Sequence, residues 1–429
     1  MFLRRSAAVL AGAALLGSAG VLGAPAALAE ESPSPKPKLP SGLYGSADPQ
    51  YDGVYRQSLA LLAQDAVGVV PAKKAVNWLA QQQCDGGSFT AYRPDPGEPC
   101  GSGSGEDAAD TNATGAAVQA LARLGGHGKT VAASVTWLKS VQNKDGGWGY
   151  NPGGDSDANS TALVVGALAA AGEKPGEVAS RTGDRTPYDA LRALQLGCDA
   201  DAGERGAFAY MPEKDELAAN DAATVAAALA ADGSGFASVA ADRPAAAEDG
   251  DATEVAAPSC GEDDTYAQKD SAKAAAAYLS GALKENKGFL PSVTPGAQDQ
   301  PDHGSTALAA LALSGIGEPG AAARPLGWLE KNIKGWDGVT TNPAALAQLV
   351  LAVHASGGDA TDFADTDLVK RLNATGPEPE RSEPENAGAD EAEEDDGGSN
   401  LVLWIVAAAL VAGIGMGLLM SMRKGGKNS

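Results

Sequence analysis

A pattern of two alternating helices, repeated along the chain, constrains the fold more than any other feature of the sequence. An amphipathic stretch that ends in a Gly-rich turn, WLKSVQNKDGGWG at 137–149, is followed by an almost wholly apolar stretch, LVVGALAAAG at 163–172. The pair recurs about every 50 to 60 residues, the length of one supersecondary unit. Because a helix that is apolar on every face has to be buried, the pattern predicts an inner layer of helices surrounded by an outer layer.

The copies of this pattern indicate a closed arrangement. The amphipathic stretch appears first at 75–89, and the later copies are stretched or weaker. Residues 55–68 supply one additional inner helix, and residues 365–374 supply one additional outer helix. We therefore expect an all-α fold in which six inner and six outer helices close into a ring. Small residues, mostly Ala, would let the inner helices crowd around one axis.

A polar cap precedes each of five buried helices. The caps read DTNATG at 110–115, DANSTA at 157–162, AANDAA at 218–223, DHGSTA at 302–307 and TTNPAA at 340–345. All five fit one frame with Asn or Gly in the third position. Because Asn at a helix start accepts orphan backbone N–H groups, the frame predicts that this third residue is the cap.

The Gly-rich turn carries a signature that points to a family. It reads Q-x-x-D-G-G-W-G from Gln142 to Gly149, with a shorter version from Gln83 to Phe89. By this signature and the alternation of helices, residues 51–374 resemble the prenyltransferase and squalene-oxidase repeat family. The resemblance implies an α/α-toroid in which the N-termini of the inner helices surround the mouth of a common cavity. Such a fold does not by itself define a function.

The same resemblance would place the caps of five repeats around that mouth. Helix N-termini carry partial positive charge, which favours ligands with acceptor groups. Capping alone would also explain each residue. The candidate ligand-binding residues of the rim are Asp110, Asn112, Asp157, Asn159, Asn220, Asp302, His303 and Asn342.

Two enzymatic functions of the family lack their chemistry here. Class II terpenoid cyclases carry D-x-D-D-T-A at such a cap, with an Asp as general acid, but DANSTA has Asn159 and Ser160 at the later Asp positions. Neither side chain can deliver the strong proton that alkene activation requires. The chain has only 6 Trp and 6 Phe, few for stabilising carbocations. Protein prenyltransferases bind zinc, and no Cys/His pair here has metal-ligand spacing. We predict no catalytic residue and no metal site, and keep a terpenoid-processing enzyme acting on a polyprenyl substrate as an alternative.

A binding protein fits the sequence better. The secreted vitamin B12 carriers of this family share export, cysteines and a missing acidic motif with this chain, although no second domain follows residue 374 here. The resemblance implies capture of a corrinoid or a similar bulky or lipid-like ligand for a membrane importer, with His303 as a candidate axial ligand of a corrinoid. A surface adhesion module is a further alternative. The net charge of -23 argues against a nucleic acid partner.

The two ends of the chain predict export and anchoring. Residues 1–29 combine two Arg, an apolar run and an A-x-A site, as in a secretory signal peptide. A Pro-rich linker is expected over 30–50, and an acidic disordered stalk over 375–400. Residues 401–422 are uncharged and long enough to span a bilayer. The basic tail 423–429 places the C-terminus in the cytoplasm, so we predict a single-pass cell-membrane protein with an extracellular body.

The four cysteines predict two disulfides. An even number of cysteines in an exported chain favours disulfides over free thiols. Cys84 with Cys100 would close a short Gly- and Pro-rich loop and is the preferred pair, which leaves Cys198 with Cys260. Cys260 lies in an acidic, Ala-rich stretch at 232–264, which we interpret as a loop over the outside of the ring.

Overall fold

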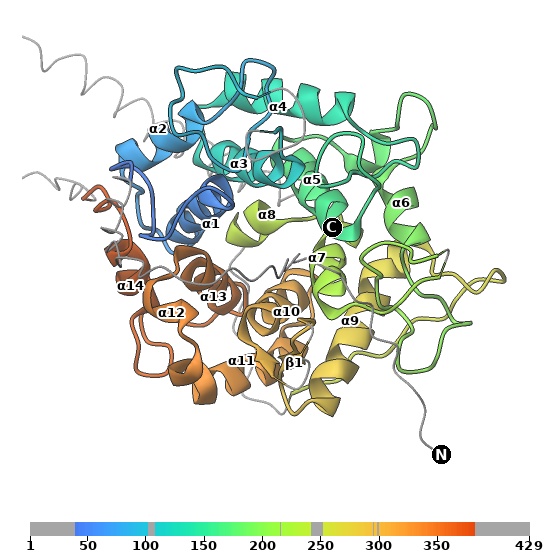
Figure 1. Cartoon of the computed structure of the whole chain (residues 1–429). Coiled ribbons are helices and arrows are strands. Elements are labelled where there is room, and N and C mark those ends of the chain that lie inside the picture. The colour runs from blue at the N-terminus through green and yellow to red at the C-terminus, as the bar shows by residue number, and fades with distance from the viewer. Residues whose placement is uncertain are drawn as a thin grey trace, which may run out of the picture. The chain divides into compact units, whose positions relative to one another are not determined.

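A computed structural model of the chain describes residues 39–101, 108–214, 216–241, 252–294, 296–297 and 300–381. In this part of the chain the helices form two concentric layers (Figure 1). The inner layer consists of α1 (Gly53–Ala66), α3 (Thr111–Leu124), α5 (Ala158–Ala170), α7 (Asp221–Ala231), α10 (His303–Gly315) and α13 (Pro343–Ala355). The outer layer consists of α2 (Lys73–Gln81), α4 (Gly128–Ser140), α6 (Pro187–Ala193), α9 (Gln268–Glu285), α11 (Pro319–Asn332) and α14 (Leu368–Ala374). The shorter helices are η1 (Pro175–Glu177), α8 (Phe236–Ala241), η2 (Ile333–Gly335) and α12 (Gly338–Thr341).

The inner helices close into a ring. Each packs against the next in chain order, and α13 packs against α1, which joins the two ends of the series. The outer helices pack on their inner neighbours: α2 on α1, α4 on α3, α6 on α5, α9 on α7, α11 on α10 and α14 on α13. The prediction of an all-α toroid is therefore confirmed for the described residues. The sheet found among them is one short antiparallel pair, β1 (Leu290–Pro291) and β2 (Pro301–Asp302).

Small side chains bring the inner helices together. Ala60 of α1, Ala117 of α3 and Ala227 of α7 are fully buried, and Leu59 and Leu313 fill the larger spaces beside such residues. Burying a Leu side chain contributes about 1.5–3 kcal/mol, whereas Ala loses no side-chain rotamer freedom on burial. The Ala-rich composition thus suits helices that are surrounded on all sides.

One helix lies inside the ring. After a turn at Gly233, α8 packs against α1, α3, α5, α10 and α13, at the centre of Figure 1. Its first turn is held by Gln119 of α3, whose Oε1 accepts the backbone N–H of Ala237 at 3.2 Å. The interpretation of residues 232–264 as a loop over the outside is therefore wrong for the first part, because Val239 is buried in the core.

The packed body extends beyond residues 51–374 at both ends. Tyr44, which the sequence places in the linker, is completely buried, and its hydroxyl donates to Pro377, which the sequence places in the stalk. The backbone N–H of Glu380 also donates to Val70. These contacts correct the boundaries of the linker and the stalk. Both segments pack where α13 meets α1, and together they cover the apolar surface of Tyr44.

The remaining terminal predictions fall outside the described residues. The signal peptide at 1–29, most of the stalk, the span at 401–422 and the tail at 423–429 are not described. Within the part that is described, no helix is long and apolar enough to cross a membrane.

Both predicted disulfides are present. Cys84 pairs with Cys100 at a Cα–Cα distance of 5.8 Å, and Cys198 pairs with Cys260 at 6.1 Å. These distances lie within the usual range for disulfides. The short link closes a loop after α2, and the long link ties the turn after α6 to the segment before α9. No cysteine of the described residues is free.

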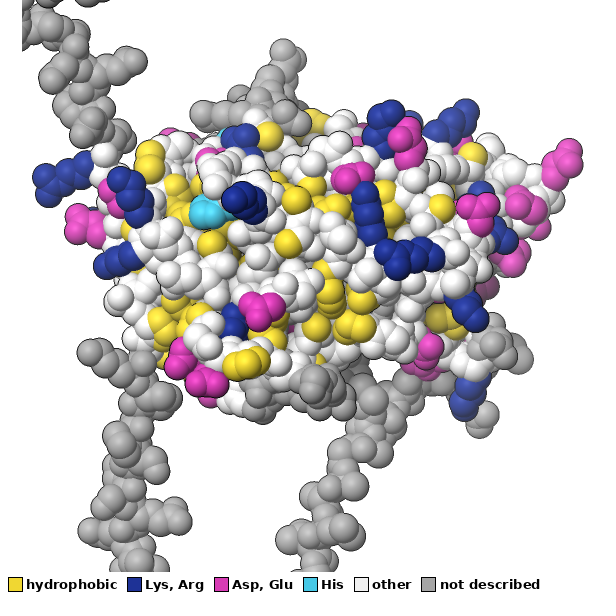
Figure 2. Space-filling model, turned by 90° about the horizontal axis from the view of Figure 1, so that it is seen from above, with side chains coloured by type: hydrophobic (Ala, Val, Ile, Leu, Met, Phe, Trp, Pro, Cys, Tyr) yellow, Lys and Arg dark blue, Asp and Glu magenta, His cyan; other side chains and the backbone are white. Residues whose placement is uncertain are grey.

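The exterior carries charges of both signs. Figure 2 shows the side of the ring on which α4 lies, where basic and acidic side chains are interspersed rather than gathered by sign. Lys139 pairs with Glu173 at 2.8 Å, and Lys174 pairs with Glu177 at 2.9 Å. Exposed pairs of this kind contribute little to stability. This face is therefore a solvated exterior, and the candidate site lies inside the ring.

Candidate functional site

A cavity of about 340 Å³ lies inside the ring. Five inner helices, α1, α3, α5, α7 and α10, contribute to its wall, and Phe236 of α8 also lines it. Most of the wall is apolar, with Ala162, Val225 and Leu308 as examples. The volume is at the small end of the range for ligand pockets, about 300–1,000 Å³, and such pockets typically combine an apolar wall with a few polar groups.

Three tyrosines line this cavity. Tyr51 and Tyr150 are among the most exposed large side chains of the described residues, and both line the cavity. Tyr55, in the first turn of α1, lines it too, and burial raises its pKa to about 12. Its hydroxyl makes no hydrogen bond with any residue that the structure describes, so it is free to bind a ligand. The sequence gives one weak signal for Tyr150, which directly follows the DGGWG turn.

The structure corrects the register of the caps. The N-caps of α3 and α5 are Asp110 and Asp157, whose carboxylates accept the N–H groups of Ala113 and Ser160, each at 2.8 Å. Asn220, Asp302 and Asn342 cap α7, α10 and α13 in the same way. The single frame with Asn as the cap therefore holds for two repeats only, because Asp and Asn serve equally well as caps.

Asn112 and Asn159 have a different position from the other asparagines. Each lies two residues after the capping Asp, inside the first turn of its helix, and each lines the cavity. The Oδ1 atoms of both are buried and have no hydrogen-bond partner in the described structure. A buried acceptor without a partner costs about 1–3 kcal/mol. These two amides, on neighbouring helices, are thus suited to accept hydrogen bonds from a ligand.

A threonine four residues after the cap has a structural role in four repeats. Its Oγ1 accepts the backbone N–H of the preceding turn: Phe89 to Thr114, Trp148 to Thr161, Phe208 to Thr224 and Leu290 to Thr306, at 2.8–3.1 Å. These bonds fix the turn to the start of the inner helix. The Thr of DANSTA is therefore explained by the fold and gives no evidence of cyclase chemistry.

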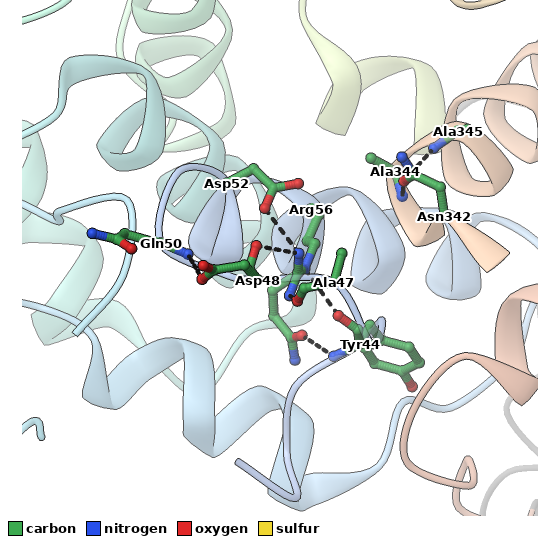
Figure 3. Close-up of polar contacts among 10 residues, drawn as sticks. Tyr44, Ala47, Asp48, Gln50, Asp52, Arg56, Asn342, Ala344 and Ala345 are labelled. Carbon is green, nitrogen blue, oxygen red and sulfur yellow. Dashed lines mark hydrogen bonds and ion pairs between the residues drawn. The ribbon is translucent and has the colours of Figure 1, made fainter. Parts of the chain in front are cut away.

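Two carboxylates line the cavity, and their surroundings differ. Asp52 is paired with the buried Arg56 at 2.9 Å (Figure 3), and that arginine also donates to the carbonyls of Tyr44 and Ala47. Asp110 has no ion-pair partner among the described residues. Burial raises the pKa of Asp110, although hydrogen bonds from the Ala113 N–H and the Tyr150 hydroxyl act in the opposite direction. Asp110 is therefore the uncompensated acid of the cavity.

Asp157 does not have the environment of an acid catalyst. Its Oδ1 accepts the Ser160 N–H at 2.8 Å and its Oδ2 accepts the Ser160 hydroxyl at 2.7 Å. The residue is almost completely buried and does not line the cavity. Burial raises its pKa, but a proton on either oxygen would not face a substrate in the cavity.

His303 points into the packing between the layers. Its ring stacks on Trp336 at a centroid distance of 5.5 Å and lies 4.9 Å from the ring of Trp328. Burial lowers its pKa. Of the eight rim residues from the sequence, the structure places Asp110, Asn112 and Asn159 at the cavity, and the other five are not in its wall. No group of three His, Cys, Asp or Glu that could hold a metal occurs among the described residues.

A family model agrees with this fold. Residues 43–192 match the family model of the prenyltransferase alpha-alpha toroid domain. The resemblance that the repeats suggest is therefore confirmed over this segment, which contains the first three inner helices. No curated protein matches the chain.

Two solved structures match the chain at low sequence identity. A protein from Actinoplanes is 17% identical, with 74% of this chain and 80% of that chain covered and a TM-score of 0.41. The type II terpene cyclase MstE from Scytonema, without ligand, is 15% identical, with 70% and 98% covered and a TM-score of 0.31.

Proposed function

We propose that this protein binds a small amphiphilic molecule inside its toroid and does not transform it. The observation that carries the proposal is the pair Asn112 and Asn159, which line a mostly apolar cavity and whose buried amide oxygens have no partner among the described residues. An apolar wall accepts an apolar body, and a few placed polar groups orient it. The engaged carboxylate of Asp157 supports binding rather than acid catalysis.

The size of the cavity favours a slimmer ligand than a corrinoid. About 340 Å³ suits a short chain or a single ring system, whereas a corrinoid would have to remain outside the cavity. His303 would have to leave its contacts with Trp328 and Trp336 to become an axial ligand. The corrinoid carrier remains the bulkier version of the proposal and is tested together with it below.

We also propose that the toroid is displayed outside the cell on a membrane anchor and passes its ligand to an importer. The support is the signal-like segment 1–29, the apolar segment 401–422 and the basic tail after it. Two disulfides in the body agree with an oxidising compartment. Detection of the body on intact cells by protease accessibility would support this location, and protection of the body would contradict it.

Ligand capture tests the binding proposal. The full-length protein in lipid nanodiscs is incubated with an extract of its own cells, and the retained small molecules are identified by mass spectrometry. Ala226→Phe fills the cavity from α7, because this side chain lines it. We expect the unchanged protein to retain one compound stoichiometrically and the Ala226→Phe variant to lose it.

The matched control is Ala132→Phe, the same substitution at an exposed position of α4. It should retain the compound as the unchanged protein does. If the Ala226→Phe variant still retains a corrinoid, the result would favour a bulky ligand that binds outside the cavity. Conversion of a polyprenyl compound to a product would favour the enzyme, and retention of polymer or protein alone would favour adhesion.

A further inference from the structure

The charged side chains that the described residues contribute to the cavity wall are all negative. Among the described residues that line it, Asp52 and Asp110 are acidic, and none is Lys, Arg or His. The nearby Arg56 does not line the cavity and is bound to Asp52 and to backbone carbonyls. An anionic group in this cavity would meet no positively charged side chain of the described residues that line it.

The helix N-termini do not make the cavity favourable for an anion. Helix starts bind anions through free N–H groups and the helix dipole. Here the first turns of α3, α5, α7, α10 and α13 are occupied by their own Asp or Asn caps. Three of these five caps are carboxylates, which offset the positive end of the helix. A phosphate or carboxylate at the start of α3 would therefore lie beside the carboxylate of Asp110.

The polar groups that remain unpaired call for a donor. The buried oxygens of Asn112 and Asn159 accept hydrogen bonds and have no partner among the described residues. The carboxylate of Asp110 can accept a further hydrogen bond beside those that it receives from Ala113 and Tyr150. The Tyr55 hydroxyl can donate or accept. A hydroxyl or an ammonium group satisfies these acceptors, and an ammonium group also compensates the charge of Asp110.

We infer that the ligand is an amphiphile with a neutral or cationic head that donates hydrogen bonds, an alcohol or an amine, and that phosphate and carboxylate heads are excluded. This inference rests on the proposed binding function and specifies its ligand class. It predicts that the cavity discriminates by head group among ligands with the same apolar chain.

Three eight-carbon probes test this selectivity: octan-1-ol, octylamine and octyl phosphate. Their binding to the full-length protein in nanodiscs is measured by calorimetry at neutral pH, with empty nanodiscs as the blank. We expect octan-1-ol and octylamine to bind, and octyl phosphate to bind at least about tenfold more weakly than octylamine, a factor that corresponds to about 1.4 kcal/mol.

Two variants separate charge from hydrogen bonding. Asp110→Asn keeps an acceptor at the helix cap and removes the charge, so the preference for octylamine over octyl phosphate should fall by about tenfold. Replacing Asn112 and Asn159 by Leu keeps the branched shape and the number of side-chain heavy atoms and removes the acceptors, so octan-1-ol should bind about tenfold more weakly. Asn342→Ala, which removes a cap outside the cavity wall, serves as the control and should change neither quantity.

The possible results distinguish the two proposals. Octyl phosphate binding as tightly as octylamine would overturn the inference about the head group and leave the binding function intact. A preference for octylamine that persists in Asp110→Asn would also overturn it, because the charge would then play no part. If none of the probes binds and the cell extract yields no ligand, the proposed function fails and the inference fails with it.

Discussion

At the scale of the residue, similar cap sequences conceal two different roles. In DANSTA, Asp157 holds the start of α5 and Asn159 faces the cavity. The sequence cannot separate these roles, since Asp and Asn are both good caps. Their positions become clear only from the backbone, where Asp157 has the extended conformation of an N-cap and Asn159 is already helical.

Substitutions at these two positions should therefore affect different properties, stability for Asp157 and ligand retention for Asn159. Asp157→Ala should lower the free energy of unfolding by about 1 kcal/mol through the lost cap and leave ligand retention unchanged. Asn159→Ala should reduce ligand retention with little loss of stability, because it removes an acceptor that has no partner. Denaturant unfolding and the capture experiment measure the two effects. Ligand loss in Asp157→Ala together with destabilisation in Asn159→Ala would contradict these roles.

At the scale of the element, the repeats predict some helices and miss another. The helices of both layers follow from the periodicity of the sequence. The turn between them needs a glycine at Gly146, because its φ is 93° and a Cβ there would collide with the Thr186 carbonyl. The helix α8 could not be predicted, because its sequence FASVAA occurs once and lies in an acidic, Ala-rich stretch. Its position depends on long-range contacts such as the bond from Ala237 to Gln119.

The two disulfides should differ in their contribution to stability. Their sequence separations are 16 and 62 residues, for which loop-closure entropy gives about 3 and about 4 kcal/mol. Replacing Cys198 and Cys260 by Ser should therefore cost about 1 kcal/mol more than replacing Cys84 and Cys100. Guanidinium unfolding of both double variants measures the difference. A larger loss for the short loop would show that local packing, rather than chain entropy, determines the order.

At the scale of the whole toroid, the ring is closed by residues from opposite ends of the described chain. Tyr44 is completely buried at this junction, where its hydroxyl contacts Gln64 at 3.1 Å and Pro377 at 3.2 Å. Gln64 also donates to Asn373 of α14 at 2.6 Å. The repeats predict that the ring closes, but they do not show how, since Tyr44 and Pro377 lie outside every repeat and carry no periodic signal.

This junction predicts that the ring unfolds as one unit. Tyr44→Ala should lower the free energy of unfolding by about 3 to 5 kcal/mol, as expected for a large aromatic side chain removed from a core. The hydrogen-exchange protection of α1 and α13 should fall together, because each covers the other across the junction. Tyr210→Ala, at an exposed position, is the matched control and should change stability by no more than about 0.5 kcal/mol. Loss of protection in α1 alone, with α13 unchanged, would mean that the two ends of the ring unfold independently and that the contact between them contributes little to the cavity's rigidity.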